Sequence, residues 1–360
     1  MSLPWAVSAV PDPRLIQAVR ARRFGGRRWI TTHGAWVMWA GHTAWKGRRP
    51  IRTSDRDCST PAARRLACLA ELALNQRFSP AIYQGLSCLR LNDRGEPEIV
   101  DLDSGREGES DPALGGAAPI DWLIRMQRLP AADFLDRRLS EGRVSLEDAA
   151  AVAAMLHRLY RDLPASAIET DAFAARFVRE IEHSVALLGP VLNRFPGISS
   201  RRLDAVRPIL TARVHGACLV DGHGDLRPAH VHLGEEISLI DALDCDSVLR
   251  QVDPWEELCL LAMMAAEIGA AWFGPALGRA FESAQDRSRS ARSAPRAGAT
   301  DRPPAPLLAF YTGYHALVRA RLAYAHLLDP AAGHRRVWLR RARRFAAMAG
   351  AGFEGWSVLG

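Results

Sequence analysis

The sequence changes its pattern at Pro130, and this change limits the folds that the chain can adopt. From residue 29 to residue 127, short runs of β-branched, aromatic and other apolar residues alternate with turn sequences such as Gly41-His42. A helical segment at residues 62–77 interrupts these runs. After Pro130 the spacing of the apolar residues becomes helical and remains so. We therefore predict an α+β fold with two lobes, a small antiparallel sheet with one main helix and a larger, mostly helical lobe.

The expected strands of the first lobe are short and lie at residues 29–32, 35–40, 43–46, 86–91, 98–100 and 122–126. The helix among them begins at Thr60-Pro61, because threonine caps a helix and proline fits its first position. In the second lobe, Ser145 followed by Asp148 predicts another helix start, and so does Asp253 before Pro254.

We divide the chain into three parts. Residues 1–28 are an N-terminal extension with a short helix, residues 29–127 are the first lobe, and residues 128–360 are the second lobe. Within the second lobe, residues 221–246 are expected to form a hairpin that carries polar side chains. Residues 282–305 are rich in Arg, Ser, Ala and Pro and have almost no large apolar side chains, so we predict a flexible loop there.

The composition of the chain indicates which binding partners and which cellular compartment to expect. The formal net charge is +7, but no basic block is interleaved with aromatic residues, so we expect no nucleic-acid partner. The six cysteines are scattered without a Cys-x-x-Cys pair, which favours a reducing compartment. The beginning of the chain lacks the pattern of a signal peptide, and the longest apolar run is too short to span a bilayer. We therefore expect a cytoplasmic protein with no membrane partner.

The most unusual polar residues of the chain lie between residues 221 and 246. They are His223-Gly224-Asp225, then His230 and His232, and Asp241 at the end of a short strand-like run. A tight loop between Asp225 and His230, followed by a hairpin, would bring the two aspartates to one cleft. Two carboxylates and an imidazole make a poor structural core but a reasonable site for metal binding and proton transfer.

This stretch resembles the catalytic loop of the aminoglycoside phosphotransferase and choline kinase group of protein-kinase-like enzymes. The motif of that group is H-G-D-x-x-x-x-N followed by a strand ending in I-D, and His223-Gly224-Asp225 and Ile240-Asp241 match it. His230 stands where the group has a metal-binding asparagine. The sequence G-H-G-D-L-R-P-A-H resembles the corresponding motif of an uncharacterised bacterial branch of the group, in which histidine is usual at this position.

The resemblance implies a bilobal protein-kinase-like fold and an ATP-dependent phosphotransferase that moves the γ-phosphate to a hydroxyl of a small molecule. It implies that Asp225 orients or deprotonates the acceptor hydroxyl, and that Asp241 and His230 hold the divalent ion. The cofactors would be ATP and Mg²⁺. Because imidazole is a softer ligand than an amide oxygen, Mn²⁺ is expected to serve at least as well.

The same resemblance assigns nucleotide binding to the first lobe. A strand lysine holds the α- and β-phosphates in such enzymes, and a glutamate on the following helix positions it, which are the places of Lys46 and Glu71. From the residues alone, Lys46 is better explained as an edge-strand lysine that deters aggregation, and the resemblance leads us to favour the ion pair with Glu71. His33-Gly34 occupies the turn that covers the phosphates, where backbone N–H groups would contact them, and no Walker A sequence is present.

Residues 127–130 would form the hinge between the lobes, where backbone groups bind the edge of the adenine. Met126 is a candidate gatekeeper or a plain core residue, and Arg128 lies in the hinge itself. In the resemblance an acid at the position of Glu257 either supports the catalytic loop or approaches the substrate.

Two alternatives remain. The chain could be a nucleotide-binding pseudokinase with a regulatory or scaffolding role, which keeps Lys46 and makes no product. It could also be a metal-dependent hydrolase that uses the cluster of aspartates with His223, His230 and His232. His230 and His232 are two residues apart, so on a strand they would share a face.

Overall fold

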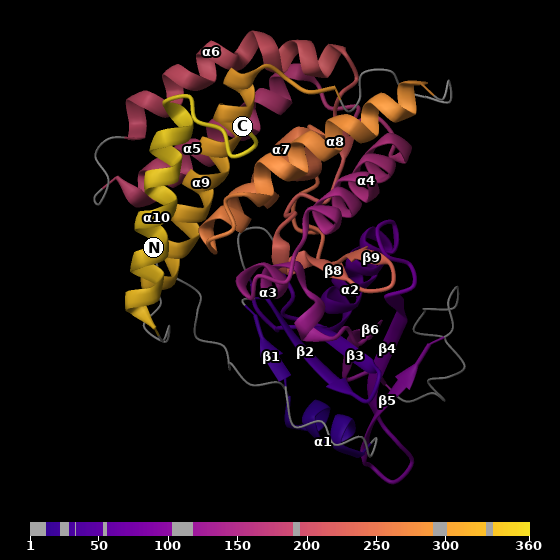
Figure 1. Ribbon diagram of the computed structural model, residues 1–360. Helices are drawn as coiled ribbons and strands as arrows, with labels where there is room; N and C mark the ends of the chain where they lie inside the picture. The colour runs from indigo at the N-terminus through magenta and orange to yellow at the C-terminus, as the bar shows by residue number, and fades with distance from the viewer. Residues whose placement is uncertain are drawn as a thin grey trace. The chain divides into compact units, whose positions relative to one another are not determined.

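The computed structural model describes residues 12–21, 29–32, 34–52, 56–102, 118–189, 195–290, 301–328 and 334–360. The chain divides into two compact units (Figure 1). The first unit consists of residues 1–131 together with residues 238–245, and the second consists of residues 132–237 and 246–360. The predicted boundary at residue 127 therefore lies four residues before the observed one, and the segment 238–245 belongs to the first unit.

The described part of the first unit contains an antiparallel sheet of six strands, as predicted. In spatial order the strands are β1 (Trp29–Thr31), β2 (Ala35–Ala40), β3 (Thr43–Arg48), β6 (Asp121–Gln127), β4 (Tyr83–Leu91) and β5 (Pro97–Asp101). The register places Lys46 of β3 opposite Val37 of β2 and Ile124 of β6. Lys46 is therefore in the interior of the sheet, and the alternative interpretation of it as an edge-strand lysine is wrong.

One helix covers each face of this sheet. Helix α1 (Pro13–Ala21) buries Leu15 and Ala18 against one face, in a cluster that contains Trp45. Helix α2 (Pro61–Gln76) buries Cys68 and Leu72 against the other face, in a cluster that also contains Ile82, Tyr83, Leu86, Cys88, Leu102, Trp122 and Ile124. Each large apolar side chain that becomes fully buried stabilises the fold by about 1.5–3 kcal/mol. Because successive strand residues point to opposite faces, Lys46 points away from the side of Trp45, toward α2.

The start of α2 follows the sequence prediction. The side chain of Thr60 accepts a hydrogen bond from the backbone N–H of Ala63, at 3.2 Å, and Pro61 is the first helical residue. These features satisfy backbone groups that a helix start leaves unpaired. They fix the rotation of α2 and hence the position of Glu71 on its buried side.

Side chains of the first unit hold the segment 238–245 by its backbone. Ser79 exchanges hydrogen bonds with the N–H and C=O of Leu239, at 3.0 and 2.8 Å. The Tyr83 hydroxyl accepts the N–H of Asp241, and the Asn75 side chain accepts the N–H of Ala242, both at 2.9 Å. The sequence prediction placed all of residues 221–246 in the helical lobe. These side-chain contacts are the physical reason for the different assignment.

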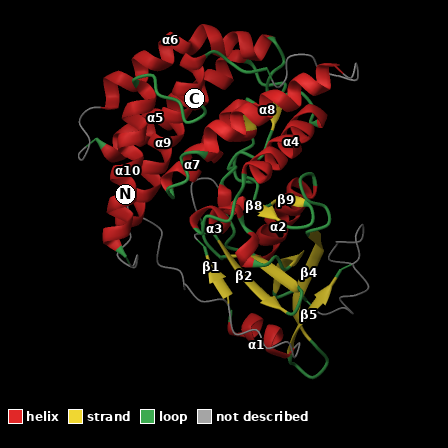
Figure 2. Ribbon diagram, in the orientation of Figure 1, coloured by secondary structure: helices red, strands yellow, loops and turns green. Residues whose placement is uncertain are grey.

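The second unit is mostly helical, as predicted (Figure 2). Its α-helices are α3 (Leu135–Ser140), α4 (Leu146–Asp162), α5 (Thr170–Leu188), α6 (Phe195–His215), α7 (Pro254–Glu267), α8 (Phe273–Ser290), α9 (Ala305–Leu328) and α10 (Arg335–Phe353). Short 3-10 turns lie at Ala131–Asp133, Pro228–His230 and Val248–Arg250. The strands β7 (Val220–Asp221) and β10 (Gln251–Val252) form an antiparallel pair, and β8 (Val231–Leu233) precedes the segment β9 (Ile237–Leu239) that leads into the first unit.

Two helix starts in this unit carry the predicted caps. Ser145 and Asp148 form a complete capping box at α4, and Asp253 accepts the N–H of Trp255 at α7. Aromatic rings fill the core between α5 and α9, where Phe177 lies edge-on to Phe173, Phe310 and Tyr314. None of the described helices has the length and apolar character that crossing a membrane requires.

The prediction of a flexible loop over residues 282–305 is wrong at its N-terminal end. Residues 282–290 complete α8, and α9 begins at Ala305. Ala284 and Gln285 are buried, and α8 packs against α4. Alanine, glutamine and arginine are good helix formers, so a segment without large apolar residues can extend a helix whose earlier turns are already packed. Residues 291–300 lie outside the described part of the chain.

Candidate active site

Lys46 contacts two carboxylates in the first unit. Its Nζ lies 2.6 Å from Oε1 of Glu71 and 2.5 Å from Oδ1 of Asp241. Glu71 is almost fully buried, with 1% of its side chain exposed. Burial by itself would lower the pKa of Lys46, but the carboxylates of Asp241 and Glu71 outweigh it and raise that pKa. The lysine is therefore a fixed positive charge, and the ion pair that the sequence predicted is present.

The structure adds charged residues that sequence reasoning missed. Arg48, two residues after Lys46 on the same face of β3, bonds Oε2 of Glu71 at 2.5 Å and also pairs with Asp244. Arg56 binds the same Asp244 carboxylate at 2.7 Å. We call Lys46, Arg48, Glu71, Asp241 and Asp244 the Lys46 cluster. The sequence could have indicated that Lys46 and Arg48 share a face, because they are two residues apart on one strand. No local pattern in the sequence indicates the contact between Arg48 and Asp244.

Asp241 has a backbone conformation that is uncommon for a residue with a side chain. Its φ is +62°, in the left-handed region, where aspartate and asparagine occur more readily than other side chains. The hydrogen bond from its N–H to Tyr83 helps to hold this conformation. The carboxyl group is 46% exposed while it contacts Lys46. An exposed carboxylate beside a buried ammonium group can bind a divalent cation and, through the lysine, an anion.

Gly34 lies in the turn between β1 and β2. The Thr32 N–H bonds the Ala35 carbonyl at 2.9 Å, and the Gly34 carbonyl accepts the N–H of Arg49, also at 2.9 Å. Among the residues that the structure describes, no atom lies within 4 Å of a side chain placed at Gly34. His33, the other residue predicted here, lies outside the described residues.

The two predicted residues at the end of β6 lie in different surroundings. Met126 packs against the apolar cluster under α2, which agrees with a core role. Arg128 is exposed, its guanidinium lies 5.7 Å from the Trp39 ring centre, and its backbone N–H bonds the His42 carbonyl. The N–H of Gln127 likewise bonds the Ile82 carbonyl. These two N–H groups are therefore already used within the first unit.

In the second unit, the loop at residues 222–230, here called the Asp225 loop, is held from behind by a buried glutamate. The carboxylate of Glu257, in the first turn of α7, accepts the backbone N–H of His223 at 3.2 Å and that of Gly224 at 2.5 Å. It also accepts the Tyr160 hydroxyl at 2.6 Å. The sequence left two roles open for Glu257, and these contacts show that it supports the loop.

Two glycines are required by the shape of this loop. Gly224 has a φ of +78°, which side chains rarely adopt. A Cβ at Gly222 would lie 2.6 Å from a methyl of Val252 and 2.8 Å from Oε2 of Glu257. Close approach to Glu257 therefore explains the first glycine of the Gly-His-Gly-Asp sequence, and backbone conformation explains the second.

Two arginines bind the carboxylate of Asp225. Arg227 Nε lies 2.9 Å from Oδ2, and Arg319 of α9 pairs with Oδ1. Burial would raise the pKa of Asp225, but the guanidinium groups of Arg319 and Arg227 outweigh it and lower that pKa. The group is therefore ionised at neutral pH. Sequence reasoning missed Arg319, which lies 94 positions from Asp225.

His230 has partners at both ring nitrogens. Nδ1 lies 2.8 Å from the Asp225 carbonyl, which can only accept, so this nitrogen carries the proton. Nε2 then accepts from Arg227, at 2.6 Å. Binding of a metal ion by His230 would require the ion to replace Arg227 at Nε2.

The other two histidines of this region, His223 and His232, contact different residues. The His223 ring lies 5.7 Å from that of His230, whereas His232 packs edge-on against Phe134. Across the described residues, no group of three or more His, Cys, Asp or Glu side chains has the arrangement of a metal site.

Replacing Glu257 by glutamine is expected to destabilise the protein by about 1–3 kcal/mol and to lower its activity. The amide nitrogen of glutamine cannot accept, so one donor among His223, Gly224 and Tyr160 is left unpaired in a buried place. Chemical denaturation measures the loss. Glu182→Gln, at an exposed position within α5, is the matched control and should change stability by less than about 0.5 kcal/mol.

The same variant should show a pH-dependent difference. Burial raises the pKa of Glu257 above its unfolded value, so the folded state binds more protons and the contribution of this group to stability falls as the pH rises above that value. Glutamine does not titrate. The stability advantage of the wild type over Glu257→Gln should therefore shrink as the pH rises, and an advantage that grows would contradict this account.

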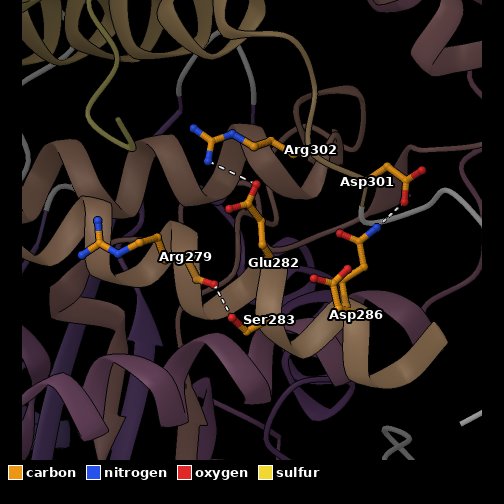
Figure 3. Close-up of a pocket in the computed structure, with 7 residues that line it drawn as sticks. Arg279, Glu282, Ser283, Asp286, Asp301 and Arg302 are labelled. Atoms are coloured by element: carbon orange, nitrogen blue, oxygen red, sulfur yellow. Dashed lines mark hydrogen bonds and ion pairs between the residues drawn. The ribbon is translucent and has the colours of Figure 1, made fainter. Parts of the chain in front are cut away.

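A pocket of about 650 Å³ lies elsewhere in the second unit, between the end of α8 and residues 301–302 (Figure 3). Its lining includes Arg279, Glu282 and Arg302, and Arg302 pairs with Glu282 at 3.2 Å. None of its lining residues belongs to the Lys46 cluster or to the Asp225 loop.

The sequence comparisons identify relatives without a known activity. No protein-family model matches the chain. Uncharacterised proteins of Mycobacterium tuberculosis and Mycobacterium bovis are 27% identical over 303 residues, which is 81% of this chain and 53% of theirs. The chain thus spans about half the length of the curated relatives it matches.

The structural comparisons concern the fold. Choline kinase from Cryptosporidium parvum is 9% identical, with a TM-score of 0.50, over 94% of this chain and 96% of that one. A choline/ethanolamine kinase family protein from Mesorhizobium loti is 14% identical, with a TM-score of 0.45, over 96% and 97% of the two chains. The comparison with choline kinase confirms the fold that we predicted from the His-Gly-Asp loop and the sheet lobe. The chain has the protein-kinase-like α+β fold of choline kinase.

Proposed function

We propose that this protein is a small-molecule kinase that moves the γ-phosphate of ATP to a hydroxyl group of its acceptor. The observation that carries the proposal is the contact of Lys46 with both Glu71 and Asp241, at 2.6 and 2.5 Å. In protein-kinase-like enzymes a strand lysine paired with a helix glutamate holds nucleotide phosphates, and a nearby aspartate holds the metal ion. The choline kinase fold supports this reading of the three residues.

In the proposed mechanism the Lys46 cluster binds the nucleotide. Lys46 contacts the α- and β-phosphates, and Glu71 and Arg48 fix its position through their own ion pair. Asp241 would hold Mg²⁺, because an exposed carboxylate offers the oxygen ligands that this ion prefers. The bound ion would neutralise negative charge on the phosphates. Positioning and charge neutralisation supply most of the rate in phosphoryl transfer.

Asp225 is the proposed base. The acceptor oxygen bonds to the γ-phosphorus while the bond from that phosphorus to the bridging oxygen breaks, and ADP leaves. The hydroxyl proton passes to the Asp225 carboxylate and then to solvent. The lowered pKa of Asp225 keeps it ionised at neutral pH, which is the protonation state that a base needs. Glu257 acts indirectly, by fixing the backbone from which Asp225 projects.

The proposal is tested with γ-labelled ATP, Mg²⁺ and a panel of acceptors that differ in charge. Labelled acceptor is separated from labelled inorganic phosphate, so that transfer and hydrolysis are measured independently. Formation of a labelled acceptor that depends on Lys46 and Asp225 is the expected result. Bound ATP with no labelled product from any acceptor would contradict an enzymatic role.

His230 leads to a prediction about the metal. We expect the wild type to use Mn²⁺ at least as well as Mg²⁺, because imidazole suits Mn²⁺ better than an asparagine oxygen does. His230→Asn should shift the preference toward Mg²⁺. Initial rates with each ion, measured for both proteins at saturating ATP, provide the test. A strict Mg²⁺ optimum in the wild type would contradict metal binding by His230 and leave it as a residue that positions Arg227.

The second candidate is a nucleotide-binding pseudokinase. The observation that favours it is that both ring nitrogens of His230 already have partners, which leaves the proposed metal site short of one ligand. This candidate predicts ATP binding that requires Lys46, with no transfer in the wild type. The labelled-ATP assay separates the two candidates.

A further inference from the structure

We propose that the acceptor is an anionic hydroxy compound, one that carries a carboxylate or a phosphate close to the hydroxyl that is phosphorylated. Arg319, together with Arg227, would bind this anion beside Asp225. The inference rests on the proposed function and assigns the substrate class of the same site. It comes from the arginines around Asp225, which the kinase mechanism itself does not use.

The two arginines occupy both oxygens of the proposed base. Arg319 pairs with Oδ1, and Arg227 donates to Oδ2 at 2.9 Å. A carboxylate with both oxygens bound by guanidinium groups is a poor base, because its lone pairs and charge are already neutralised. Arg319 is distant from Asp225 in the sequence and contacts it from helix α9.

The balance of charge points to an anion. In the described part of the chain, both arginines make their ion pairs with Asp225, so these three side chains carry a net charge of +1. His230 adds none, because its Nδ1 donates and its Nε2 accepts. The side chains are only 16% exposed for Arg319 and 26% exposed for Arg227. Burial, together with the nearby charges of Arg227 and Arg341, lowers the pKa of Arg319 despite Asp225. A partly buried excess cation favours an anionic ligand and opposes a cationic one.

An anionic acceptor would also release the base. A guanidinium group has five N–H donors in a planar fork that fits a carboxylate or a phosphate. When the anion of the acceptor takes the donors of Arg319, Oδ1 of Asp225 becomes free to accept the hydroxyl proton. An acceptor without the anion leaves Arg319 on Asp225. Binding and activation of the correct substrate are thereby the same event, which gives selectivity.

The experiment compares matched acceptors and arginine variants. The acceptor pairs are glycerate and glycerol, glucose 6-phosphate and glucose, with choline and glucosamine as cationic acceptors. We expect kcat/KM to be at least about 10-fold higher for the anionic member of a pair. Arg319→Gln should raise KM for the anionic acceptor about 10- to 100-fold, because a charge-assisted pair is lost. The KM for the neutral acceptor should change far less. Comparison of kcat/KM for glycerate and for glucose 6-phosphate then shows whether the site prefers a carboxylate or a phosphate.

Controls keep the result specific. Arg158→Gln, at an exposed position of α4, should behave as the wild type. Arg319→Lys keeps the charge but loses the planar fork, so it should recover part of the affinity for the anion. Thermal unfolding confirms that Arg319→Gln is folded, since Arg227 still neutralises Asp225 in it.

Two results would overturn the inference. One is a wild type that prefers neutral or cationic acceptors, and the other is an Arg319→Gln variant with unchanged selectivity. Calorimetry of glycerate and glucose 6-phosphate binding, without nucleotide, tests the inference separately from catalysis. If no acceptor is phosphorylated, the proposed function fails. Anion binding that is lost in Arg319→Gln would still support the anion site, and absence of anion binding to the wild type would overturn it.

Discussion

Replacing Asp225 by asparagine is expected to lower phosphoryl transfer by about a thousandfold while ATP still binds. Asparagine has nearly the same shape but cannot take the proton of the acceptor hydroxyl, and a positioned base contributes about 10²–10⁴ to the rate. The contacts that we propose between the Lys46 cluster and the nucleotide do not involve this side chain. The expected pattern is therefore a fall in kcat with little change in the dissociation constant of ATP.

The measurement needs a control for charge, because Asp225→Asn leaves Arg227 and Arg319 without their carboxylate. Asp221→Asn is a suitable match, since Asp221 pairs with Arg250 at 2.9 Å and precedes the same loop. That variant should retain activity and lose less than about 1 kcal/mol of stability. Transfer by a folded Asp225→Asn protein at the wild-type rate would exclude Asp225 as the base.

Replacing Lys46 by methionine is expected to weaken ATP binding about 100-fold or more and also to destabilise the first unit. The variant removes the ammonium group from Glu71, which is almost fully buried, and from Asp241. Breaking a buried ion pair costs about 3–5 kcal/mol, and the remaining contact of Arg48 with Glu71 should keep the loss near the lower limit. Calorimetry with ATP and thermal unfolding give the two quantities.

A second substitution separates the two effects. In Lys46→Met with Glu71→Gln, the buried carboxylate is absent, so stability should partly recover while ATP affinity stays low. Lys46 is also the single lysine of the sequence. An acyl-phosphate derivative of ATP, which acylates nearby amines, should therefore modify one side chain and be blocked by excess ATP. ATP-independent modification, or unchanged ATP affinity in the double variant, would refute the assignment of Lys46 to the nucleotide site.

The sequence by itself determined the elements of the fold. Strand-prone runs and helical spacing predicted the sheet and the helical second lobe, and the caps at Thr60, Ser145 and Asp253 lie where expected. These predictions succeed because hydrophobic spacing and capping are local properties. The pairing of Lys46 with Glu71 was also predictable, through the resemblance and the order of strand and helix.

The tertiary structure decided which distant side chains meet. The contacts of Asp244 with Arg48 and Arg56, and of Asp225 with Arg319, join residues 94 to 196 positions apart. The hydrogen bonds that attach residues 238–245 to the first unit likewise come from side chains about 160 positions earlier. Polar contacts of this kind depend on the packing of whole elements, and no local pattern of residues encodes them. The charge around the proposed base, and with it the proposed substrate class, follows from that packing.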